Sequence, residues 1–349
     1  MIDLFGIGNA LVDFESEVTD TFLEDHSLEK GQMYLKNEPE IGLIRNSLRS
    51  SDLKMSSGGS AANTIYGASG FGLNTAYCGR VQDDKAGAFF VKEMKEAGIQ
   101  VDDIRVESSQ PKSTGNCLVL VTDDAQRTMC TNLGISSELS VEDLNLSRLE
   151  SSGYLYVEGY LAASKTGSRA AQRAIQVAKE RSVSVLLTLS DVSMVNFFRS
   201  DIEKFCGSQI DTIFCNEEEA LCWAGTDRLD IAFKRLKEIG KGIHITIGSK
   251  GSLVCGPDET PKEVKGFETV AIDTNGAGDM YAAATISMLA RGFTHVEAAR
   301  FGNYAAAQIV RRYGARLSSV RGYQTVQNQF DNRERVRILS FNRFSVFNI

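Results

Sequence analysis

The sequence predicts an α/β fold with a central, mostly parallel sheet flanked by helices and a small β-sheet lid. In the second half of the chain, short apolar runs of strand length alternate with longer runs of helical length, a pattern typical of parallel strands joined by helices. Two earlier segments have hairpin-like patterns that interrupt this alternation, and we interpret them as the lid. The expected division is a core at 1–13, 37–111 and 135–321, a lid at 14–36 and 112–134, and a C-terminal extension of undefined fold at 322–349.

The individual elements follow from apolar periodicity and from the glycine residues that interrupt it. The apolar opening, Ile2–Val12, predicts a first strand, Met33–Leu35 predicts a short lid strand, and Thr122–Gln126 predicts a hairpin turn. Further strands are expected at 74–79, 114–121, 127–133, 154–157, 183–189, 212–215, 242–247 and 267–271. Helices are expected at 38–48, 89–97, 169–181, 192–205, 217–224, 228–239 and 281–291, with one more that ends near Gly70.

The bulk composition excludes several classes of protein. The chain has 349 residues, of which 42% are hydrophobic and 24% are charged, so it can bury a large core, and its net charge of −7 argues against general affinity for nucleic acids. No run approaches the roughly 18 apolar residues of a membrane span, and the N-terminus has no signal-peptide pattern. Seven cysteines without a Cys-x-x-Cys pair and three scattered histidines argue against a disulfide framework or a zinc site. We therefore expect a cytoplasmic protein.

A glycine turn at Gly276–Gly278 lies between the expected strand 267–271 and the expected helix 281–291. Backbone N–H groups and the positive end of the helix dipole favour an anion such as phosphate at a helix N-terminus. Asp279 follows directly, and a carboxylate beside an anion site suits a base that accepts a proton from an attacking hydroxyl. The alternative is that the glycines only shape a tight turn and that Asp279 only favours the start of the helix.

Two further segments carry polar residues suited to a substrate with hydroxyl groups. Gly58 and Gly59 precede a run of small residues, where a ligand can approach the backbone closely, and Asn63 offers an amide one helical turn later. Asn9 and Asp13 end the first strand, and ligands of open parallel sheets bind beyond the carboxyl ends of strands. A tight contact between helices would equally explain the small residues, and a turn or helix cap would equally explain Asp13.

Two other loops follow expected strands and suit a nucleotide. Asn216 and Glu219 are three residues apart, which places them on one helical face where they can hold Mg²⁺ through water. The alternative is an acidic first turn that complements the helix dipole. Gly248, Ser249 and Gly251 belong to a glycine-flanked loop that suits phosphates or ribose, or alternatively to a hairpin turn that lets the next strand pair back.

Together these segments resemble the ribokinase-like (PfkB) family of carbohydrate and nucleoside kinases. The segment around Gly58-Gly59 is similar to the first family signature, and residues 273–279 are similar to the second, more specific one. The order and spacing of the segments agree with the family from residue 1 to near residue 320. Within the family, the chain is most similar to bacterial adenosine kinases, through residues 6–13, 124–129, 187–191 and 216–220 and through Thr274-Asn275.

The resemblance implies an ATP-dependent phosphotransferase whose acceptor is a primary hydroxyl, expected to be the 5′-hydroxyl of adenosine, with AMP as the product. Asp279 is then the catalytic base, and the anion hole consists of Gly276, Ala277 and Gly278. The residues implied in substrate binding are Asn9, Asp13, Gly58, Gly59 and Asn63. Those implied in ATP binding are Asn216, Gly248, Ser249, Gly251 and Asn303. Asn216 and Glu219 are implied in holding Mg²⁺ through water, and Asp273 and Asn275 in binding a monovalent cation such as K⁺.

Several alternatives stay open. The acceptor could be a sugar similar to fructose or ribose, or another nucleoside such as inosine or guanosine, and the protein could also bind nucleosides without catalysis. Met33, Tyr34, Leu133 and Phe14 are candidates for the purine pocket, although each could equally pack within the lid. The expected partner is a small-molecule nucleoside or sugar, with no nucleic acid and no membrane. The protein is expected to be a monomer or a homodimer that pairs through the lid.

Overall fold

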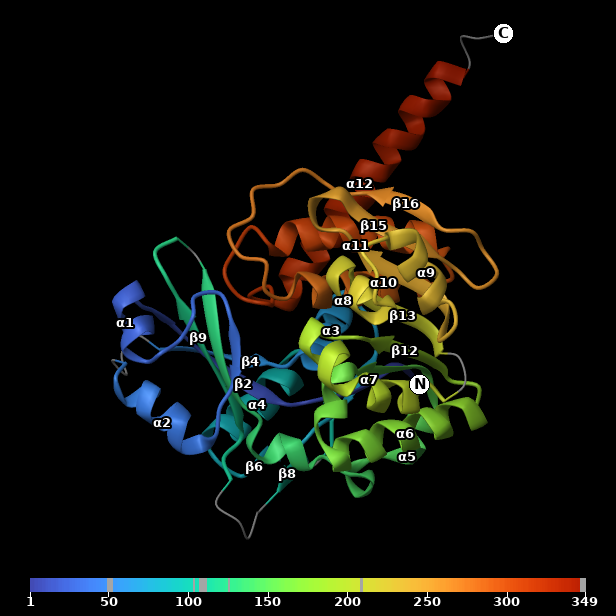
Figure 1. Ribbon diagram of the computed structural model, residues 1–349. Coiled ribbons are helices and arrows are strands. Elements are labelled where there is room, and N and C mark those ends of the chain that lie inside the picture. The colour runs from blue at the N-terminus through green and yellow to red at the C-terminus, as the bar shows by residue number, and fades with distance from the viewer. Residues whose placement is uncertain (49–52, 103, 107–111, 125, 208–209, 346–349) are drawn as a thin grey trace.

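The computed structural model describes residues 1–48, 53–102, 104–106, 112–124, 126–207 and 210–345, with side chains up to residue 335. Parts of the expected core and lid ranges lie outside the described residues, as do Ala125 in the expected hairpin turn and residues 346–349 of the expected extension. The described residues form a large sheet flanked by helices and a smaller sheet beside it (Figure 1). This arrangement confirms the predicted α/β architecture with a separate small sheet.

The large sheet is parallel except at one edge, in keeping with the alternation of strands and helices. Its strands, in spatial order, are β16 (Lys262–Lys265), β15 (Gly251–Cys255), β14 (Gly240–Thr246), β13 (Ile210–Asn216), β12 (Ser184–Thr188), β11 (Ser152–Glu158), β1 (Ile2–Ile7), β5 (Thr75–Cys78) and β7 (Gln100–Val101). The antiparallel pairs are β14 with β15 and β15 with β16. A separate short pair consists of β6 (Val81–Gln82) and β8 (Arg105–Val106).

The first strand occupies the middle of the large sheet, where β11 and β5 pair with it on either side. Its Leu4 and Ile7 side chains are fully buried. A strand that is covered on both faces consists of a nearly continuous apolar run, which explains why β1 lacks the alternation of a half-exposed strand. The strand ends at Ile7, and our prediction that it reaches Val12 is wrong. The Gly8 N–H still donates to the Cys78 carbonyl at 3.2 Å, but the Asn9 N–H donates to Glu158 Oε1 at 2.6 Å, and the ladder does not continue beyond it.

Helices cover both faces of the large sheet, and an apolar core lies on each side. Polar caps begin several of the helices: Ser164 Oγ accepts the N–H of Gly167 at 2.9 Å, and Thr294 and Glu297 form a capping box. The first core includes side chains of α3 (Ser60–Gly70), α4 (Lys85–Glu96), α10 (Ala277–Leu289), α11 (His295–Ile309) and α12 (Val320–Ser345). The second core includes side chains of α5 (Leu146–Glu150), α6 (Lys165–Glu180), α7 (Val192–Cys206), α8 (Glu217–Ala224) and α9 (Leu229–Leu236).

The small sheet consists, in spatial order, of β3 (Met33–Leu35), β10 (Arg127–Asn132), β9 (Gly115–Val121), β2 (Leu11–Glu17) and β4 (Lys54–Gly58). Strand β4 comes from the range expected for the core, and β3 pairs with β10 rather than with β2, so the first lid segment is not a hairpin. Helices α1 (Asp20–Asp25) and α2 (Glu38–Asn46) lie along this sheet (Figure 1). Their Leu23, Ile41 and Ile44 share an apolar cluster with Phe14 and Leu118. One face of the small sheet is therefore covered by helices.

Residues 267–271 do not form the expected strand. The segment does not pair with β16, the strand at this edge of the large sheet, and so forms no ladder hydrogen bonds. The Phe267 ring instead packs against Tyr304 of α11, with 5.2 Å between the ring centroids, and Val270 is 81% exposed. Alternation of apolar and polar residues predicts a strand only where a pairing partner exists.

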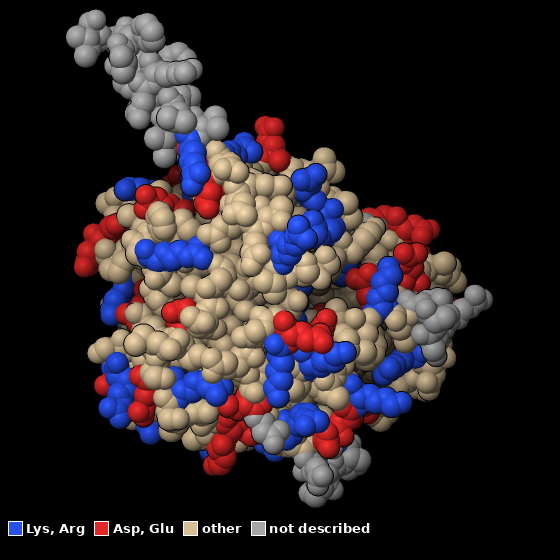
Figure 2. All heavy atoms as spheres, turned by 180° about the vertical axis from the view of Figure 1, so that it is seen from behind, with Lys and Arg blue, Asp and Glu red and all other residues tan. Residues whose placement is uncertain are grey.

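The C-terminal extension, whose fold the sequence pattern does not define, forms the long helix α12. Its first turns belong to the body of the protein, because Tyr323 is fully buried and packs edge-on against Phe71. The other end of the helix projects away from the body (Figure 1). Within the described part of the chain, no helix is both long and apolar enough to cross a membrane. Acidic and basic side chains are interspersed over the face seen in Figure 2.

Candidate active site

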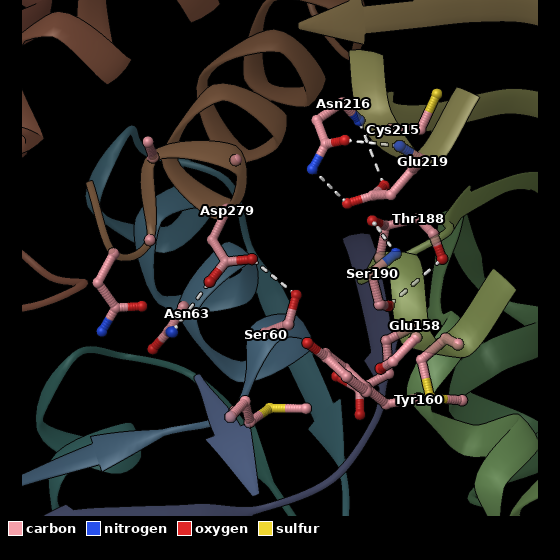
Figure 3. Close-up of a pocket in the computed structure, with 18 of the residues that line it drawn as sticks. Ser60, Asn63, Glu158, Tyr160, Thr188, Ser190, Cys215, Asn216, Glu219 and Asp279 are labelled. Carbon is pink, nitrogen blue, oxygen red and sulfur yellow. Dashed lines mark hydrogen bonds between the residues drawn. The ribbon is translucent and has the colours of Figure 1, made fainter. Parts of the chain in front are cut away.

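A cavity of about 790 Å³ is lined by loops at the carboxyl ends of the parallel strands, by the small sheet and by the N-terminal turns of α3 and α10 (Figure 3). Open α/β sheets bind ligands at this edge. The predicted site residues that line the cavity are Asn9, Asp13, Gly59, Asn63, Asn216, Glu219, Gly248, Asn275, Gly276, Ala277, Gly278 and Asp279. The predicted residues outside the lining are Gly58, Ser249, Gly251, Asp273 and Asn303.

Asp279 lies in the first turn of α10 and faces the cavity. Helix α10 begins at Gly276, whose φ of 72° is left-handed and whose Cα would carry a Cβ only 2.5 Å from Ala315. Two residues of α3 hold the Asp279 carboxylate: Ser60 Oγ donates to Oδ1 at 2.6 Å, and Asn63 Nδ2 donates to Oδ2 at 3.0 Å (Figure 3). The carboxylate is therefore fixed between two helix N-termini.

Burial raises the pKa of Asp279 to about 6, while the hydrogen bonds from Ser60 and Asn63 and the charge of Arg316 oppose this rise. The carboxylate keeps part of its surface toward the cavity, although protein surrounds it on its other sides. A carboxyl with this pKa is ionised at neutral pH, yet it accepts a proton more readily than an ordinary aspartate. These are properties of a general base.

The glycine turn offers backbone N–H groups to the same cavity. The Ala277 N–H closes a turn to the carbonyl of Thr274 at 3.2 Å. The next N–H groups belong to the first turn of α10, where an α-helix provides no internal acceptor. Gly278 lines the cavity, and apart from its chain neighbours and the nearby backbone of α10, no atom lies within 4 Å of the position that a Cβ would take there. The space in front of Gly278 is therefore open to a ligand.

Glu158, at the end of β11, is a cavity residue that sequence reasoning missed. It is fully buried and accepts hydrogen bonds from Asn9 N at 2.6 Å, Asn9 Nδ2 at 2.9 Å and Ala61 N at 2.8 Å. Burial raises the pKa of Glu158 to about 7. Its position after the apolar run Leu155–Val157 was a usable signal, because a carboxylate rarely ends a buried strand without a partner. Glu158 ties the Asn9 loop to the start of α3.

Asp13 lies on β2 of the small sheet rather than at the end of the first strand. Gly58 leaves room for it, because a Cβ at Gly58 would lie 2.3 Å from Asp13 Oδ1. Gly59 adopts a φ of 95°, and a Cβ there would lie 2.2 Å from the Asn9 carbonyl oxygen. Burial raises the pKa of Asp13 to about 6, opposed by Arg316 and Arg127. The glycine pair therefore brings the α3 N-terminus directly against Asp13.

Asn216 and Glu219 form the capping box of α8, which is the structural alternative raised from the sequence, and both also line the cavity. Asn216 Nδ2 donates to Glu219 Oε1 at 2.6 Å (Figure 3). Burial raises the pKa of Glu219 to about 7, and the charges of Asp191, Asp279 and Glu218 raise it further. Crowded carboxylates favour a cation. One carboxylate and one amide oxygen form a donor set that fits Mg²⁺ held largely through water.

The predicted nucleotide loop lies at the turn between β14 and β15, which pair as the alternative hairpin requires. Gly248 lines the cavity, while Ser249 is exposed outside its lining. Gly251 is packed against backbone, since a Cβ there would lie 2.1 Å from the Val264 carbonyl oxygen. Asn303 is buried behind the loop, and its Nδ2 donates to the same carbonyl at 2.9 Å. ATP contacts of these residues stay predictions.

Asp273 is buried outside the cavity lining, where it has two backbone donors and one arginine ion pair. Its Oδ1 accepts the N–H of Asn275 at 2.9 Å, its Oδ2 accepts the N–H of Gly314 at 2.7 Å, and the Arg127 guanidinium lies 2.7 Å from Oδ2. Asn275 itself lines the cavity. Binding of K⁺ at Asp273 and Asn275 stays a prediction, and Arg127 now supplies a positive charge at this carboxylate.

Apolar side chains of the lid and of α7 line one part of the cavity. Of the four candidates for a purine pocket, Met33 and Leu133 line it. Phe14 instead packs within the lid core, and Tyr34 Oη accepts the N–H of Glu29 at 2.8 Å. Further apolar or aromatic lining residues, which the sequence alone did not indicate, are Cys117, Val119, Met129, Tyr160, Met194, Phe197 and Phe198.

A parallel sheet with a small-sheet lid, and a carboxylate at a glycine-started helix in the cavity between them, define a kinase of ribokinase-like fold. The chain belongs to the pfkB family of carbohydrate kinases, whose sequence profile matches residues 36–321. The family prediction made from the sequence is therefore confirmed, and membership implies the use of ATP.

Similar proteins include both nucleoside and sugar-acid kinases. Adenosine kinase 1 of Arabidopsis thaliana is 26% identical over 338 residues, which cover 89% of this chain and 94% of that protein. The 5-dehydro-2-deoxygluconokinase of Clostridium perfringens is 26% identical over 263 residues, covering 72% and 78% respectively. The crystal structure of adenosine kinase from Sinorhizobium meliloti is similar at a TM-score of 0.86 and 30% identity, covering 94% of this chain and 99% of that one.

Proposed function

We propose that the protein transfers the γ-phosphoryl group of ATP to the 5′-hydroxyl of adenosine, giving AMP and ADP. The observation that carries the proposal is Asp279, a carboxylate of raised pKa fixed by Ser60 and Asn63 beside the open space at Gly278. Phosphoryl transfer needs alignment and charge neutralisation more than covalent chemistry. A base beside backbone N–H donors supplies both.

In the proposed reaction, Asp279 orients the acceptor hydroxyl and takes its proton as the oxygen attacks phosphorus. The N–H groups of the Gly276–Gly278 turn stabilise charge on the transferred group. The lid residues lining the cavity exclude water, which limits hydrolysis of ATP. When bound, Mg²⁺ neutralises charge on the phosphates, and Asn216 and Glu219 would hold its water ligands.

The lining of the cavity favours a nucleoside over a simple sugar. Val119, Met129, Met33 and Leu133 from the lid and Met194 from α7 form apolar surface that a planar base can cover. A sugar or sugar acid needs hydrogen-bond donors and acceptors across most of its surface instead. The names of the relatives agree with this preference, since adenosine kinases are among them.

An acceptor panel tests the proposal. Release of ADP from Mg·ATP is measured with adenosine, inosine, guanosine, fructose, ribose and a sugar acid, each with and without K⁺. We expect the highest kcat/KM with adenosine, at least about tenfold above the other nucleosides, because a single mismatched polar group in a pocket has this effect or more. A clear preference for fructose, ribose or the sugar acid would replace adenosine as the acceptor, and loss of turnover without K⁺ would establish the cation requirement.

A further inference from the structure

Arg316, in the segment between α11 and α12, meets the catalytic carboxylate through one intermediate side chain. Its Nε donates to Asn63 Oδ1 at 2.8 Å, and Asn63 Nδ2 donates onward to Asp279 Oδ2 at 3.0 Å. Arg316 does not line the cavity. Its guanidinium lies over the Tyr66 ring, 4.6 Å from the centroid, which fixes the plane of the group. The three residues form a hydrogen-bonded series from the back of α3 to the active site.

The series has a defined polarity. A guanidinium only donates hydrogen bonds, so the Asn63 carbonyl must face Arg316 and the Asn63 NH₂ must face Asp279. If the amide turned over, two donors would meet at Arg316 and two acceptors would meet at the ionised Asp279. Asn63 can therefore only donate to Asp279, and a group that only donates favours the ionised carboxylate. Asn63 also lines the cavity, and the binding of substrate hydroxyls by its amide stays a prediction.

We propose that Arg316 is a positioning residue for phosphoryl transfer: it locks the Asn63 amide in the orientation that keeps Asp279 an ionised proton acceptor. The inference rests on the proposed function of Asp279 as base. Arg316 also supplies a positive charge near Asp13, and its Nη2 is enclosed without a hydrogen-bond partner among the described residues. A buried guanidinium with an unused donor is expensive to keep for packing alone.

Other titratable groups surround Arg316, Asn63 and Asp279, and the test must distinguish their electrostatic effects from the effect of Arg316. Arg316 is faced by Tyr66 of α3, Glu93 of α4, Asp13 of β2 and Tyr323 of α12. Groups that interact electrostatically with Asp279 are Asp13, Tyr156, Glu158, Tyr160 and Glu219. Asp13 is the nearest competitor, because Arg316 opposes the rise of the pKa of both aspartates.

The test compares Arg316→Met, Arg316→Gln and Arg316→Lys with wild type in the pH dependence of kcat at saturating substrates. Without the positive charge and the Nε donor, the Asn63 amide is free to turn and accept from a protonated Asp279. We expect Arg316→Met and Arg316→Gln to move the acid limb up by about one pH unit, which lowers kcat at pH 6 about fivefold and changes kcat at pH 8 by only about 10%. Arg316→Lys keeps the charge, so its acid limb stays near that of wild type. Two different neutral variants keep the test usable if one of them does not fold.

Two comparisons isolate the route through Asn63. In an Asn63→Ala background, Arg316→Met is expected to lower kcat by much less than in wild type, because the two residues act as one unit. The matched control is Arg300→Met. It removes a partly buried arginine of α11 that lies 2.8 Å from Glu334 of α12, and it should leave the pH profile unchanged. An unshifted acid limb in both neutral Arg316 variants, or full additivity with Asn63→Ala, would overturn the proposal.

A second measurement does not depend on turnover. The pKa of Asp279 in the folded protein, about 6, exceeds its ordinary value of 3.8, so the free energy of unfolding falls as pH rises from 4 through 6. If Arg316→Met raises this pKa further, the fall extends to higher pH, and the extension shrinks in an Asp279→Asn background. An equal extension in both backgrounds contradicts the proposal. A wild-type protein inactive on every acceptor would refute the proposed function, whereas these unfolding data would still decide the role of Arg316.

Discussion

The guanidinium of Arg127 lies 2.7 Å from the carboxylate of Asp273, and this ion pair joins the lid to the segment that carries the glycine turn. Arg127 begins β10 of the small sheet and also lies 3.1 Å from Glu15 of β2. Asp273 precedes the turn at Gly276 by three residues, and its own side chain is almost fully buried. The position of the lid is therefore coupled to the loop whose N–H groups we expect to bind the phosphoryl group during its transfer.

Arg127→Met is expected to loosen this coupling. The substitution leaves Asp273 buried with only backbone donors, and removal of one partner from a buried ion pair costs about 3 kcal/mol. We expect a lower melting temperature and a higher KM for the acceptor. Arg105→Met, which breaks an exposed pair with Asp83, is the control and should change neither quantity measurably. Equal melting temperatures of Arg127→Met and wild type would contradict the stabilising role of the pair.

Substitution by alanine should have different effects at the two glycines of the turn. Gly278→Ala places a methyl group in open cavity space, so the protein should fold with a wild-type melting temperature while kcat falls about 100-fold, as for loss of a charge-stabilising donor. Gly276→Ala must accommodate a left-handed φ and a contact of 2.5 Å with Ala315, so it should destabilise the fold. Thermal melting and steady-state kinetics check both. A fully active Gly278→Ala enzyme would exclude the space at Gly278 as the phosphoryl position.

The pH dependence of the reaction should reflect the pKa of about 6 that burial gives Asp279. The base must be ionised to accept a proton, so kcat/KM should fall as pH drops below 6 and level off above 7. Asp279→Asn should lower kcat by about 10²–10⁴-fold, the usual contribution of a general base. Stopped or coupled assays from pH 5 to 9 provide the profile. Near-normal turnover of a folded Asp279→Asn protein would show that another group takes the proton.

Glu219→Gln should weaken the response to Mg²⁺ without unfolding the protein. The amide keeps an oxygen for the capping box of α8 but removes the negative charge that attracts the cation. We expect the Mg²⁺ concentration for half-maximal turnover to rise about tenfold, as is typical for loss of a supporting group near a metal. Titration of Mg²⁺ at fixed ATP measures it, with Glu180→Gln, at an exposed residue of α6 outside the cavity lining, as the control. An unchanged midpoint in Glu219→Gln would remove this residue from the metal site.

The features that were predicted correctly are those determined by residues close to one another in the sequence. The alternation of strands and helices predicted the large sheet, and the glycine turn before Asp279 correctly predicted the start of a helix. Both follow from local backbone preferences that a single segment displays. The strand expected at 267–271 failed because pairing depends on a partner that the segment itself does not specify.

The features that were missed depend on contacts between distant residues. Glu158 contacts the Asn9 loop across 149 positions, and Arg316 contacts Asn63 across 253 positions. Arg316 has no local pattern that differs from an ordinary surface charge, and the local signal for Glu158, a carboxylate at the end of a buried apolar run, does not show which residues it contacts. Asp13 was expected on the wrong strand because the change from the large sheet to the small one occurs within three residues, 8–10, whose pattern resembles a continuation of β1. Such residues become visible only when the chain is folded.

The central place of β1 has a consequence for synthesis of the protein. Strand β1 is synthesised well before one of its two neighbours, β11, which ends only at Glu158. Until β11 has emerged, the backbone of β1 can form ladder hydrogen bonds at one edge only, with β5. Nascent chains of this kind expose an unpaired strand edge that favours aggregation or chaperone binding. Truncation before Glu158 should therefore yield insoluble fragments, whereas a chain that includes β11 can pair both edges of β1.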